Sequence, residues 1–323
     1  MRAMILAAGL GTRLLPLTNS RPKALFPLRG VTMLDFWIER LNQFGFDAVF
    51  LNAYHLKDHI CRAISKKDWP LPVRVIEEPV LLGTGGGIKG AVEHFEDDPA
   101  VVINVDIVSD ANLSELLCQH KDSGAKVSLL LHDWPEFNNV AVDEAGYILG
   151  FGREAEAIRQ SGNGVRLLAF TGVHFINASA LADSARGVPG DILTVYRRLI
   201  AGGAPPRALY QEGLFWREMG SIGSYWKLTM ELADLKSGCL RPLPTGQSIS
   251  IHPEAVVQPG SNLRGSIVAG PGVRIESGAS LNNVILWDGV RVEKDSCLKD
   301  CIVADGMSVA GRHAGKIFAP DLT

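Results

Sequence analysis

The chain has 323 residues, of which 46% are hydrophobic and 21% charged, so general disorder is excluded and the length predicts two domains. With 32 basic and 35 acidic residues the net charge is −3, so no overall positive field favours nucleic acid as a partner. No apolar run approaches the roughly 20 residues of a membrane-spanning helix, so no membrane partner is expected. The five scattered cysteines form no C-x-x-C pair, which argues against zinc and indicates a cytoplasmic location.

The first strand is predicted at 4–8, where an apolar run ends in Gly9-Leu10-Gly11-Thr12-Arg13. From Thr32 the apolar residues recur at helical spacing, which predicts a helix over 33–44 with Thr32 and Asp35 as a capping box. Strands are then predicted at 48–51, 73–76, 101–105 and 127–131, with a helix at 113–120. Strands that alternate with helices predict an α/β fold with a doubly wound, mostly parallel mixed sheet of Rossmann-like form.

After residue 130 the sequence predicts short antiparallel strands at 141–151 and 167–176, joined by glycine-bearing loops, and a last helix at 224–235. From Ile251 onward apolar pairs recur about six residues apart, in coils of about eighteen residues. This repeat indicates a left-handed parallel β-helix, with an ordinary antiparallel β-domain as the alternative. The predicted domains are 1–235 for the α/β part, 236–250 for a linker, 251–312 for the hexapeptide-repeat β-helix and 313–323 for a tail.

The N-terminal stretch 1–34 carries five basic side chains and no acidic one: Arg2, Arg13, Arg21, Lys23 and Arg29. Two glycines in the turn at 9–13 let backbone N–H groups approach a phosphate, and Arg13 and Lys23 add charge, which together predict an anion site. A solvated glycine turn is the alternative. Leu14 stands where a dinucleotide turn has its third glycine, and no Walker motif occurs, so a dehydrogenase or a Walker-type ATPase is disfavoured.

The runs at 5–14, 16–18 and 22–28 closely resemble the signature of sugar-1-phosphate nucleotidyltransferases, and the resemblance extends through most of the stretch 1–235. The C-terminal repeat is similar to that of several members. Such enzymes couple a nucleoside triphosphate to a sugar 1-phosphate and release pyrophosphate, so the resemblance implies these two substrates. It also implies that Arg13 and Lys23 neutralise the reacting phosphates. The nucleotide contacts implied for the turn are Leu6, Ala7, Ala8, Gly9, Gly11 and Thr12.

The resemblance also implies Mg²⁺ as the cofactor, and Mg²⁺ prefers carboxylates together with water and phosphate oxygens. Asp106 is the first candidate ligand, because it follows the apolar strand 101–105 at the edge where α/β sheets bind ligands. Its motif Asn104-Val105-Asp106 has valine where the family has glycine. Glu218 is the second candidate, since the run 216–221 matches a Trp-x-Asp-x-Gly-Thr motif with glutamate for aspartate. Asp110 is expected to cap the helix before residue 113.

The stretch 82–88 resembles a family loop that runs along the nucleotide base, with a plain flexible loop as the alternative. The residues expected to contact the base through main-chain groups are Gly83, Thr84, Gly85 and Gly86. Many members hold the sugar phosphate with the lysine of a Glu-Lys-Pro motif, which this chain lacks at 151–155. The weak candidates for that role are Arg153, Glu154 and Gly172.

The leading prediction is an enzyme that makes an NDP-sugar, with GTP and mannose 1-phosphate as first candidates. Enzymes for heptose, N-acetylmuramate or glucose 1-phosphate, the last with dTTP or UTP, follow closely. The alternative is a catalytically weak regulatory or scaffold paralogue that binds NDP-sugars and assembles through the β-helix. An acyltransferase in the β-helix is disfavoured, because no histidine occurs between His252 and His313. We expect a homo-oligomer formed through the β-helix.

Overall fold

The computed structural model describes residues 1–95, 99–162 and 164–320, which form two compact units. The first unit joins Met1–Gly9 to Ile38–Arg217, and the second joins Leu10–Trp37 to Glu218–Thr323. Residues 10–37, called the basic segment below, therefore group with the C-terminal part of the chain. The predicted domain boundary at residue 235 follows the sequence pattern and stays a prediction.

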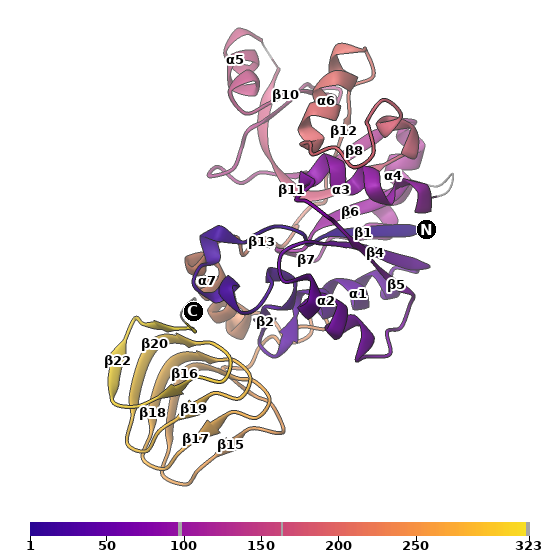
Figure 1. The fold of residues 1–323 in the computed structure, drawn as a ribbon. Helices are drawn as coiled ribbons and strands as arrows, with labels where there is room; N and C mark the ends of the chain where they lie inside the picture. The colour runs from indigo at the N-terminus through magenta and orange to yellow at the C-terminus, as the bar shows by residue number, and fades with distance from the viewer. Residues whose placement is uncertain (96–98, 163, 321–323) are drawn as a thin grey trace. The chain divides into compact units, whose positions relative to one another are not determined.

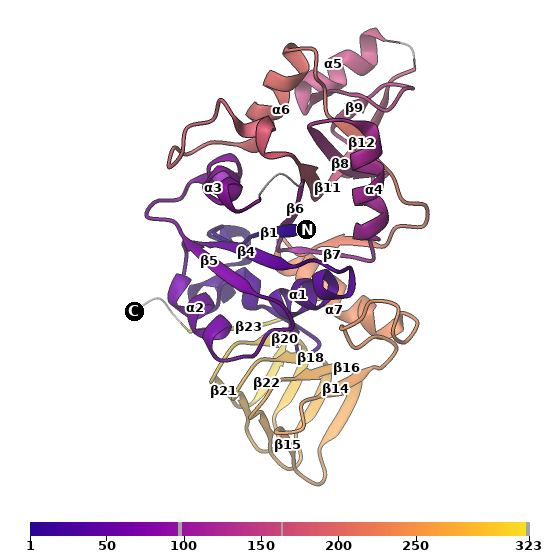
Figure 2. The same ribbon diagram turned by 90° about the vertical axis from the view of Figure 1, so that its right-hand side faces the viewer.

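A nine-stranded sheet forms the centre of the first unit, and its N-terminal strands are parallel. The elements of this half are β1 Arg2–Leu6, β4 Ala48–Ala53, α2 Lys57–Ser65, β5 Val73–Glu77, α3 Gly83–Ala91, the 3₁₀ helix η4 Val92–His94 and β6 Ala100–Asn104. β1 lies between β4 and β6, and β5 forms the edge. Figure 2 shows α3 and α2 on opposite faces of these strands. The predicted doubly wound, mostly parallel α/β sheet is confirmed.

The rest of the unit contains the mostly antiparallel half of the sheet and a separate two-stranded sheet of β7 and β13. Its elements are β7 Ile107–Ser109, α4 Leu113–Ser123, β8 Val127–His132, β9 Val140–Val142, β10 Ile148–Phe151, α5 Arg153–Ser161, β11 Arg166–Ile176, η5 Ala178–Leu181, α6 Ile192–Ala201, β12 Arg207–Leu209 and β13 Trp216–Glu218. β11 runs antiparallel to β6, β8 and β9, and β7 pairs with β13. The antiparallel strands predicted after residue 130 are therefore confirmed as a class.

The single strand predicted at 141–151 is wrong, because the structure has the two antiparallel strands β9 and β10 there. A turn separates them, in which the Asp143 carboxylate accepts from Tyr147 N at 2.7 Å and Gly146 has a φ of 82°. The glycine-bearing loop expected next contains helix α5. Its sequence hides the helix, because Ala155 is its one buried residue and most of the others are polar.

Two helix starts test the predicted caps. At α1, Met33–Gln43, the Thr32 hydroxyl accepts from Asp35 N at 3.1 Å, while the Asp35 carboxylate accepts from Thr32 N at 3.3 Å. The predicted capping box is thus confirmed. At α4 the cap predicted for Asp110 is wrong: Asn112 accepts from Glu115 N, and Asp110 instead accepts from Phe215 N at 2.9 Å.

The second unit contains the basic segment, helix α7 and a stack of parallel strands. Its first elements are η1 Thr12–Leu14, η2 Leu17–Asn19, η3 Lys23–Leu25, β2 Pro27–Leu28, β3 Val31–Thr32 and α7 Ile222–Asp234. The stacked strands are β14 Ile249–Ile251, β15 Val256–Val257, β16 Asn262–Ala269, β17 Arg274–Ile275, β18 Ser280–Leu286, β19 Arg291–Val292, β20 Cys297–Val303, β21 Ser308–Val309, β22 Arg312–Ala314 and β23 Ile317–Phe318. Figure 1 shows β16, β18 and β20 stacked as successive layers.

The strand register confirms a parallel β-helix. Val256 pairs with Arg274 on the next coil, and Arg274 pairs in turn with Arg291 on the coil after that. The spacing of these partners along the chain matches the coil length expected from the sequence. The interior of the stack is apolar, with Ile275, Leu281 and Val292 fully buried.

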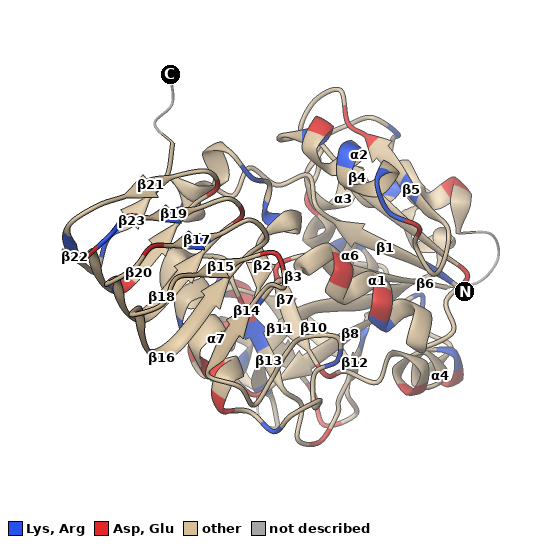
Figure 3. Cartoon of the chain, turned by 90° about the horizontal axis from the view of Figure 1, so that it is seen from below, with Lys and Arg blue, Asp and Glu red and all other residues tan. Residues whose placement is uncertain are grey.

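The outer surface of the β-helix carries both signs of charge, as Figure 3 shows. Arg291 pairs with Glu276 at 3.1 Å and with Glu293 at 3.3 Å. The surface therefore has no single-sign field to attract a polyanion. In the described part of the chain, no helix combines the length and the apolar character needed to cross a membrane.

Candidate active site

The first unit brings the end of β1 to the middle of the carboxyl edge of the sheet. Here Leu6 pairs with Asn104 at the end of β6, and Val105 N donates to Leu6 O at 3.2 Å. A Cβ placed on Gly9 would meet nothing within 4 Å, so space is open where the chain leaves the strand. Ligands of α/β proteins bind at this edge, which agrees with the role expected for residues 6–9.

Asn52 and Glu78 form a buried relay that the sequence did not predict. Ala7 N donates to Asn52 Oδ1 at 2.8 Å, and Asn52 Nδ2 donates to Glu78 Oε1 at 2.7 Å. The other oxygen of Glu78 accepts from Leu82 N at 2.9 Å. Both side chains are at most 3% exposed. The relay fixes the residues before the glycine turn against the start of α3; its signal in the sequence was Glu78-Pro79, just ahead of the glycines.

The stretch 82–88 is not the loop that the sequence predicted, because α3 begins at Gly83. Its glycines permit close packing: a Cβ on Gly86 would lie 2.6 Å from Val188 O, and one on Gly85 would lie 3.1 Å from Gly190 O. Gly85 N donates to Gly190 O at 2.8 Å, and Gly86 N donates to the same oxygen at 3.4 Å. These two N–H groups are therefore already hydrogen-bonded within the protein.

Thr84 joins the starts of two helices. Its hydroxyl donates to Asp191 Oδ1 at 3.2 Å and accepts from Ile192 N at 3.0 Å. Asp191 is the N-cap of α6, since its carboxylate also accepts from Leu193 N. The carboxylate thus lies at the positive ends of both helices and occupies the place that an anion would favour.

Asp106 follows β6 at the same edge as Leu6, as the sequence predicted. Gly172 belongs to β11, the strand that pairs with β6. It lies where the pairing of β11 with β8 shifts register, and its φ is 81°. A Cβ on Gly172 would lie 2.8 Å from Asn104 Nδ2, so only glycine fits this close approach. The structure therefore brings Leu6, Asn104 and Gly172 together at the end of β6.

An aromatic cluster lies next to this shift in β11. Trp216 Nε1 donates to Thr171 O at 2.8 Å, and the Trp216 ring packs on Trp134 with 5.7 Å between centroids. The Arg217 guanidinium lies 4.8 Å from the Trp134 centroid. Burial lowers the pKa of His132 in this cluster; Asp133 opposes that shift, and Arg217 adds to it. Sequence reasoning missed Arg217, which stands inside the motif that points to Glu218.

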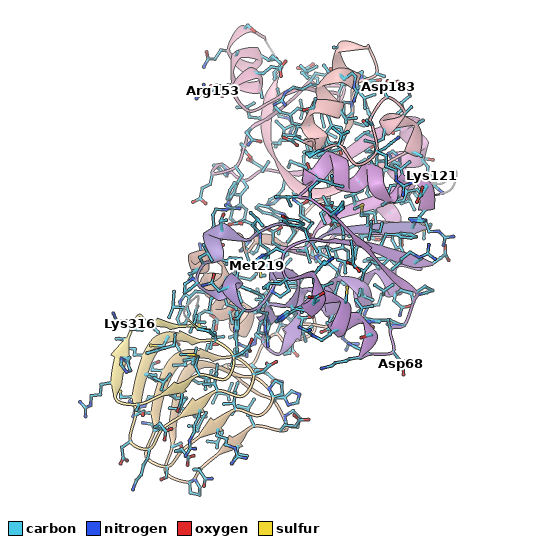
Figure 4. All side chains as sticks on the ribbon, viewed as in Figure 1. Asp68, Lys121, Arg153, Asp183, Met219 and Lys316 are labelled. Carbon is cyan, nitrogen blue, oxygen red and sulfur yellow. The ribbon has the colours of Figure 1, made fainter. Side chains whose placement is uncertain are left out.

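Arg153 and Glu154 lie apart from this edge, on the exposed first turn of α5. Phe151 pairs with Val140, and Val140 pairs with Leu168, so α5 begins two strands away from β11. Figure 4 shows Arg153 at the outer end of this part of the first unit. Glu154 is 3.5 Å from Arg197. The structure therefore does not group these two residues with Gly172.

The second unit begins with the rest of the glycine turn. Gly11 has a φ of 65°, and a Cβ there would lie 2.7 Å from Thr18 Cγ2, so glycine is required twice over. Thr18 Oγ1 donates to Gly11 O at 3.0 Å, which fixes the turn. The 3₁₀ helix η1 follows, and the first N–H groups of a helix have no partner inside it. Thr12 and Arg13 occupy this first turn, where the sequence predicted triphosphate contacts.

Arg13 and Glu218 meet around Gly220. Gly220 N donates to Glu218 Oε2 at 2.6 Å, so this carboxylate folds back onto the backbone. A Cβ on Gly220 would contact the Glu218 carboxylate and would lie 2.7 Å from Arg13 Nη2. Arg13 is exposed, and across the described ranges its guanidinium makes no hydrogen bond or ion pair. A cation without a partner is suited to bind an anionic ligand.

The four basic residues of the basic segment separate into different roles. Arg29 is 1% exposed, and its guanidinium donates to Pro244 O at 2.9 Å and to Ser266 Oγ at 3.1 Å. Burial lowers its pKa, although Asp234 opposes the shift. Arg21 forms ion pairs with carboxylates of the β-helix. Only Arg13 and Lys23, at the start of η3, remain candidates for phosphates within the basic segment.

The donors suited to Mg²⁺ are the carboxylates of Asp106 in the first unit and Glu218 in the second. Among the residues that the structure describes, no three His, Cys, Asp or Glu side chains form a group that could hold a metal. Mg²⁺ commonly takes one or two carboxylates and completes its shell with water and substrate phosphates. Each carboxylate, taken by itself, is a donor of the type that Mg²⁺ prefers.

Comparison with known proteins agrees with this fold. A family model described as nucleotidyl transferase matches residues 2–234, and a second, described as the GMPPB C-terminal domain, matches residues 245–314. The mannose-1-phosphate guanylyltransferase of Mycobacterium tuberculosis is 30% identical over 296 residues, which cover 88% of this chain and 79% of that protein. The N-acetylmuramate alpha-1-phosphate uridylyltransferase of Caulobacter vibrioides is 32% identical over 216 residues, covering 62% of this chain and 85% of that protein.

A solved structure has the same fold. HddC from Yersinia pseudotuberculosis, complexed with GMP-PN, superposes with a TM-score of 0.59 at 19% identity and covers 71% of this chain and 98% of that protein. The match to the first family model, from residue 2 to residue 234, takes in well over half of the chain. The chain therefore belongs to the nucleotidyl transferase family, as its resemblance to the sugar-1-phosphate nucleotidyltransferases implied.

Proposed function

We propose that this protein transfers a nucleotidyl group from a nucleoside triphosphate to a sugar 1-phosphate, with GTP and mannose 1-phosphate as the first candidates. The matches that support this pair are the guanylyltransferase of Mycobacterium tuberculosis and the GMPPB C-terminal domain. Another relative, the UTP–glucose-1-phosphate uridylyltransferase of Synechocystis, is 24% identical over 327 residues, covering 89% of this chain and 83% of that protein. UTP and glucose 1-phosphate are therefore the second candidates.

In this reaction an oxygen of the sugar phosphate attacks the α-phosphorus of the triphosphate. A new P–O bond forms, the bond to the β-phosphate breaks, and pyrophosphate leaves with the electron pair. Both reactants are anions, so the protein must position them and neutralise charge. The observation that carries the proposal is the open glycine turn followed by Arg13, whose guanidinium has no hydrogen bond or ion pair in the described ranges. We assign Arg13 and Lys23 to the phosphates.

We assign Mg²⁺ to Asp106 and Glu218, and when bound it would neutralise charge on the phosphate oxygens. Titration of Mg²⁺ into Asp106→Asn and Glu218→Gln variants tests this assignment. We expect each variant to need more metal for half-maximal rate. Asp110→Asn is the matched control, because Asp110 is engaged with Phe215 N. Unchanged metal dependence in both variants would overturn the assignment.

The nucleotide contacts divide into two groups. For Leu6, Ala7, Ala8, Gly9, Gly11 and Thr12 we propose contact with the triphosphate, which the open space beside Gly9 supports. For Gly83, Thr84, Gly85 and Gly86 we propose that α3 forms a wall beside the base, since two of the N–H groups already donate to Gly190 O. Base selection would then rest on shape more than on main-chain hydrogen bonds.

For the sugar phosphate we propose Arg217 in place of Arg153, while Gly172 keeps its assigned place beside the sugar. Trp216, the neighbour of Arg217, donates to Thr171 O next to Gly172, whereas Arg153 and Glu154 lie on the exposed turn of α5. The Arg217 guanidinium stacks on the Trp134 ring and donates to Trp216 O at 2.8 Å, and an arginine held in this way is a group suited to phosphate oxygens. Arg217→Ala should raise KM for the sugar phosphate about tenfold, and Arg153→Ala is the matched control; the reverse result would restore Arg153.

Pyrophosphate release from a panel of triphosphates and sugar 1-phosphates tests the proposed reaction. We expect one pair to exceed the others, with GTP and mannose 1-phosphate first. Two departures favour the second candidate, a catalytically weak protein that binds NDP-sugars: Val105 replaces glycine, and Glu218 replaces aspartate. Binding of NDP-sugars without turnover of any pair would establish that alternative.

We also propose that the protein is a cytoplasmic homo-oligomer that assembles through its β-helix. All five cysteines are free thiols, as in a reducing compartment. The first coil exposes Ile249, Val256 and Val257, each at least 36% accessible. Light scattering of a Val256→Glu, Val257→Glu variant should show a smaller particle than the unmodified chain; an equal mass would refute assembly at this coil.

A further inference from the structure

Arg21 joins the basic segment to two successive coils of the β-helix. Its Nε donates to Asp305 Oδ2 at 2.9 Å, and its Nη2 donates to Asp305 Oδ1 at 2.7 Å. Nη2 also donates to Asp288 Oδ2 at 2.7 Å. Asp288 follows β18 and Asp305 follows β20, so the two carboxylates occupy equivalent places one coil apart. The Arg21 side chain is only 14% exposed.

Aromatic rings enclose the same guanidinium. Arg21 Cζ lies 5.1 Å from the centroid of the Trp287 ring, and Trp287 packs edge-on against Phe26 at 4.8 Å. Trp287 Nε1 donates to the Tyr225 hydroxyl at 3.0 Å, which donates to Pro27 O at 2.7 Å. The rings of Phe26, Tyr225 and Trp287 are fully buried. The chain is therefore fixed to the β-helix and α7 on both sides of Lys23.

This arrangement constrains position more than it adds stability. Burial raises the pKa of the Asp305 carboxyl, although the Arg21 guanidinium opposes the shift. When charges are removed from water, the cost of desolvation cancels most of the attraction between them. Replacing such an ion pair by apolar side chains of equal volume therefore often leaves the free energy of unfolding unchanged or raises it. A bidentate guanidinium does fix the angle and register of the groups that it joins. Here it fixes a backbone in which Lys23 follows Arg21 and Pro22 directly.

We propose that Arg21 is a positioning residue that sets the place of Lys23 by joining the basic segment to Asp288 and Asp305. The β-helix then takes part in catalysis, and is more than a cap or an assembly surface. This inference rests on the proposed function, in which Lys23 meets the reacting phosphates. Arg21 itself touches no substrate.

A double-mutant cycle separates positioning from stability. Arg21→Ala should lower kcat about 10- to 100-fold, because a small misplacement of a charged group is costly. In a Lys23→Ala background the same change should lower kcat no further, since the group that Arg21 positions is already gone. Arg21→Lys and Asp288→Asn each remove only some of the hydrogen bonds between Arg21 and the two carboxylates. They replace Arg21→Ala in the cycle if that variant does not fold. Lysine cannot form the fork, so Arg21→Lys should not restore kcat.

Arg291→Ala is the matched control, because it breaks exposed ion pairs on the same β-helix whose partners, Glu276 and Glu293, are not in the basic segment. It should leave kcat unchanged. Hydrogen exchange at residues 23–26 supplies a readout without turnover: exchange should speed up in the Arg21 variants and not in Arg291→Ala. Equal losses of kcat with and without Lys23, or unchanged exchange at 23–26, would overturn the inference. A wild-type protein that turns over no substrate pair would refute the proposed function alone, and the exchange result would still decide this inference.

Discussion

Two glycine-rich stretches of this chain look alike in sequence and differ in what surrounds them. At residues 9–13 a Cβ on Gly9 would meet nothing within 4 Å, and Arg13 nearby is exposed. At residues 83–87 every glycine has protein atoms within 3.1 Å of where a Cβ would stand. In the first stretch Gly9 leaves room for something from outside to approach, while Gly11 serves the turn itself; in the second stretch every glycine lets the protein approach itself.

The difference shows why a glycine run alone does not identify a ligand site. The deciding observation is whether the space beside the backbone is open or filled. On this test the turn at 9–13 is a candidate for phosphate contact, whereas the α3 glycines are packed against other parts of the protein. Four predictions test this contrast.

The largest effect is expected at the open stretch. Arg13→Ala and Lys23→Ala should each lower kcat about 100- to 1000-fold, because each removes a positive group assigned to the reacting phosphates. The melting temperature should change little, since Arg13 is exposed. Arg274→Ala, an exposed arginine of the β-helix, is the control for loss of charge alone. Full activity in both variants would end the claim that this stretch contacts substrate.

The relay between the two stretches should show the next largest effect. Glu78 accepts from Asn52 Nδ2 and from Leu82 N, so Glu78→Gln would place an NH₂ group against one of these donors. A buried donor without an acceptor should lower the free energy of unfolding by about 2–3 kcal/mol. Glu77→Gln is the matched control, because the neighbouring Glu77 is exposed and pairs with Lys57. Urea unfolding compares the two.

If Glu78→Gln is no less stable than Glu77→Gln, the relay does not hold the stretches together. A fall in kcat without loss of stability would instead assign Glu78 to the chemistry. Either result would change the role assigned to Glu78, because the relay is the structural link between the end of β1 and the start of α3.

Replacing a glycine of α3 by alanine should lower the stability at Gly86 and raise it at Gly90. A Cβ on Gly86 would lie 2.6 Å from Val188 O, a backbone atom, so Gly86→Ala should lower the free energy of unfolding by about 1–2 kcal/mol despite better helix propensity. Gly90 in the same helix has nothing within 4 Å, so Gly90→Ala should add about 0.5–1 kcal/mol. Equal changes in thermal unfolding would mean that α3 is not tightly packed.

The sequence predicted the fold well wherever a pattern is regular. The apolar runs at 48–51 and 73–76 are β4 and β5, and Thr32 with Asp35 caps α1. The six-residue repeat predicted the coil length of the β-helix. Periodicity and capping are local properties, so a single sequence carries them.

The rest depended on contacts far along the chain. Whether Gly85 faces solvent or the distant Gly190 has no local signal. Likewise Arg21 and Arg13 look equal in the sequence, yet one is engaged by Asp288 and Asp305 while the other makes no such pair within the described ranges. Helix α5 was missed because one buried alanine gives no periodic stripe. Long-range pairing decides the glycine and arginine cases.

The smallest expected effect is a dependence of stability on pH, in the region of β11 and α6 that packs near α3. His174 is 1% exposed on β11, and neither ring nitrogen has a hydrogen-bond partner in the part of the chain that the structure describes. Burial lowers its pKa to about 3. Its ring packs 5.8 Å from that of Tyr196 on α6, the helix whose start packs against α3.

Because the folded pKa lies below the ordinary value of 6.5, the unfolded chain binds the proton first as pH falls. The contribution of His174 to the free energy of unfolding is therefore complete above pH 6.5 and is lost progressively toward pH 3. We expect a loss of about 1 kcal/mol between pH 7 and pH 5.5. Urea unfolding at these two pH values measures the loss, and His174→Leu should reduce it. Hydrogen exchange should speed up in α3 and α6 and not in the basic segment. An equal pH dependence in His174→Leu would assign the loss to another group, and equal exchange in both regions would remove the difference between the filled and the open stretch.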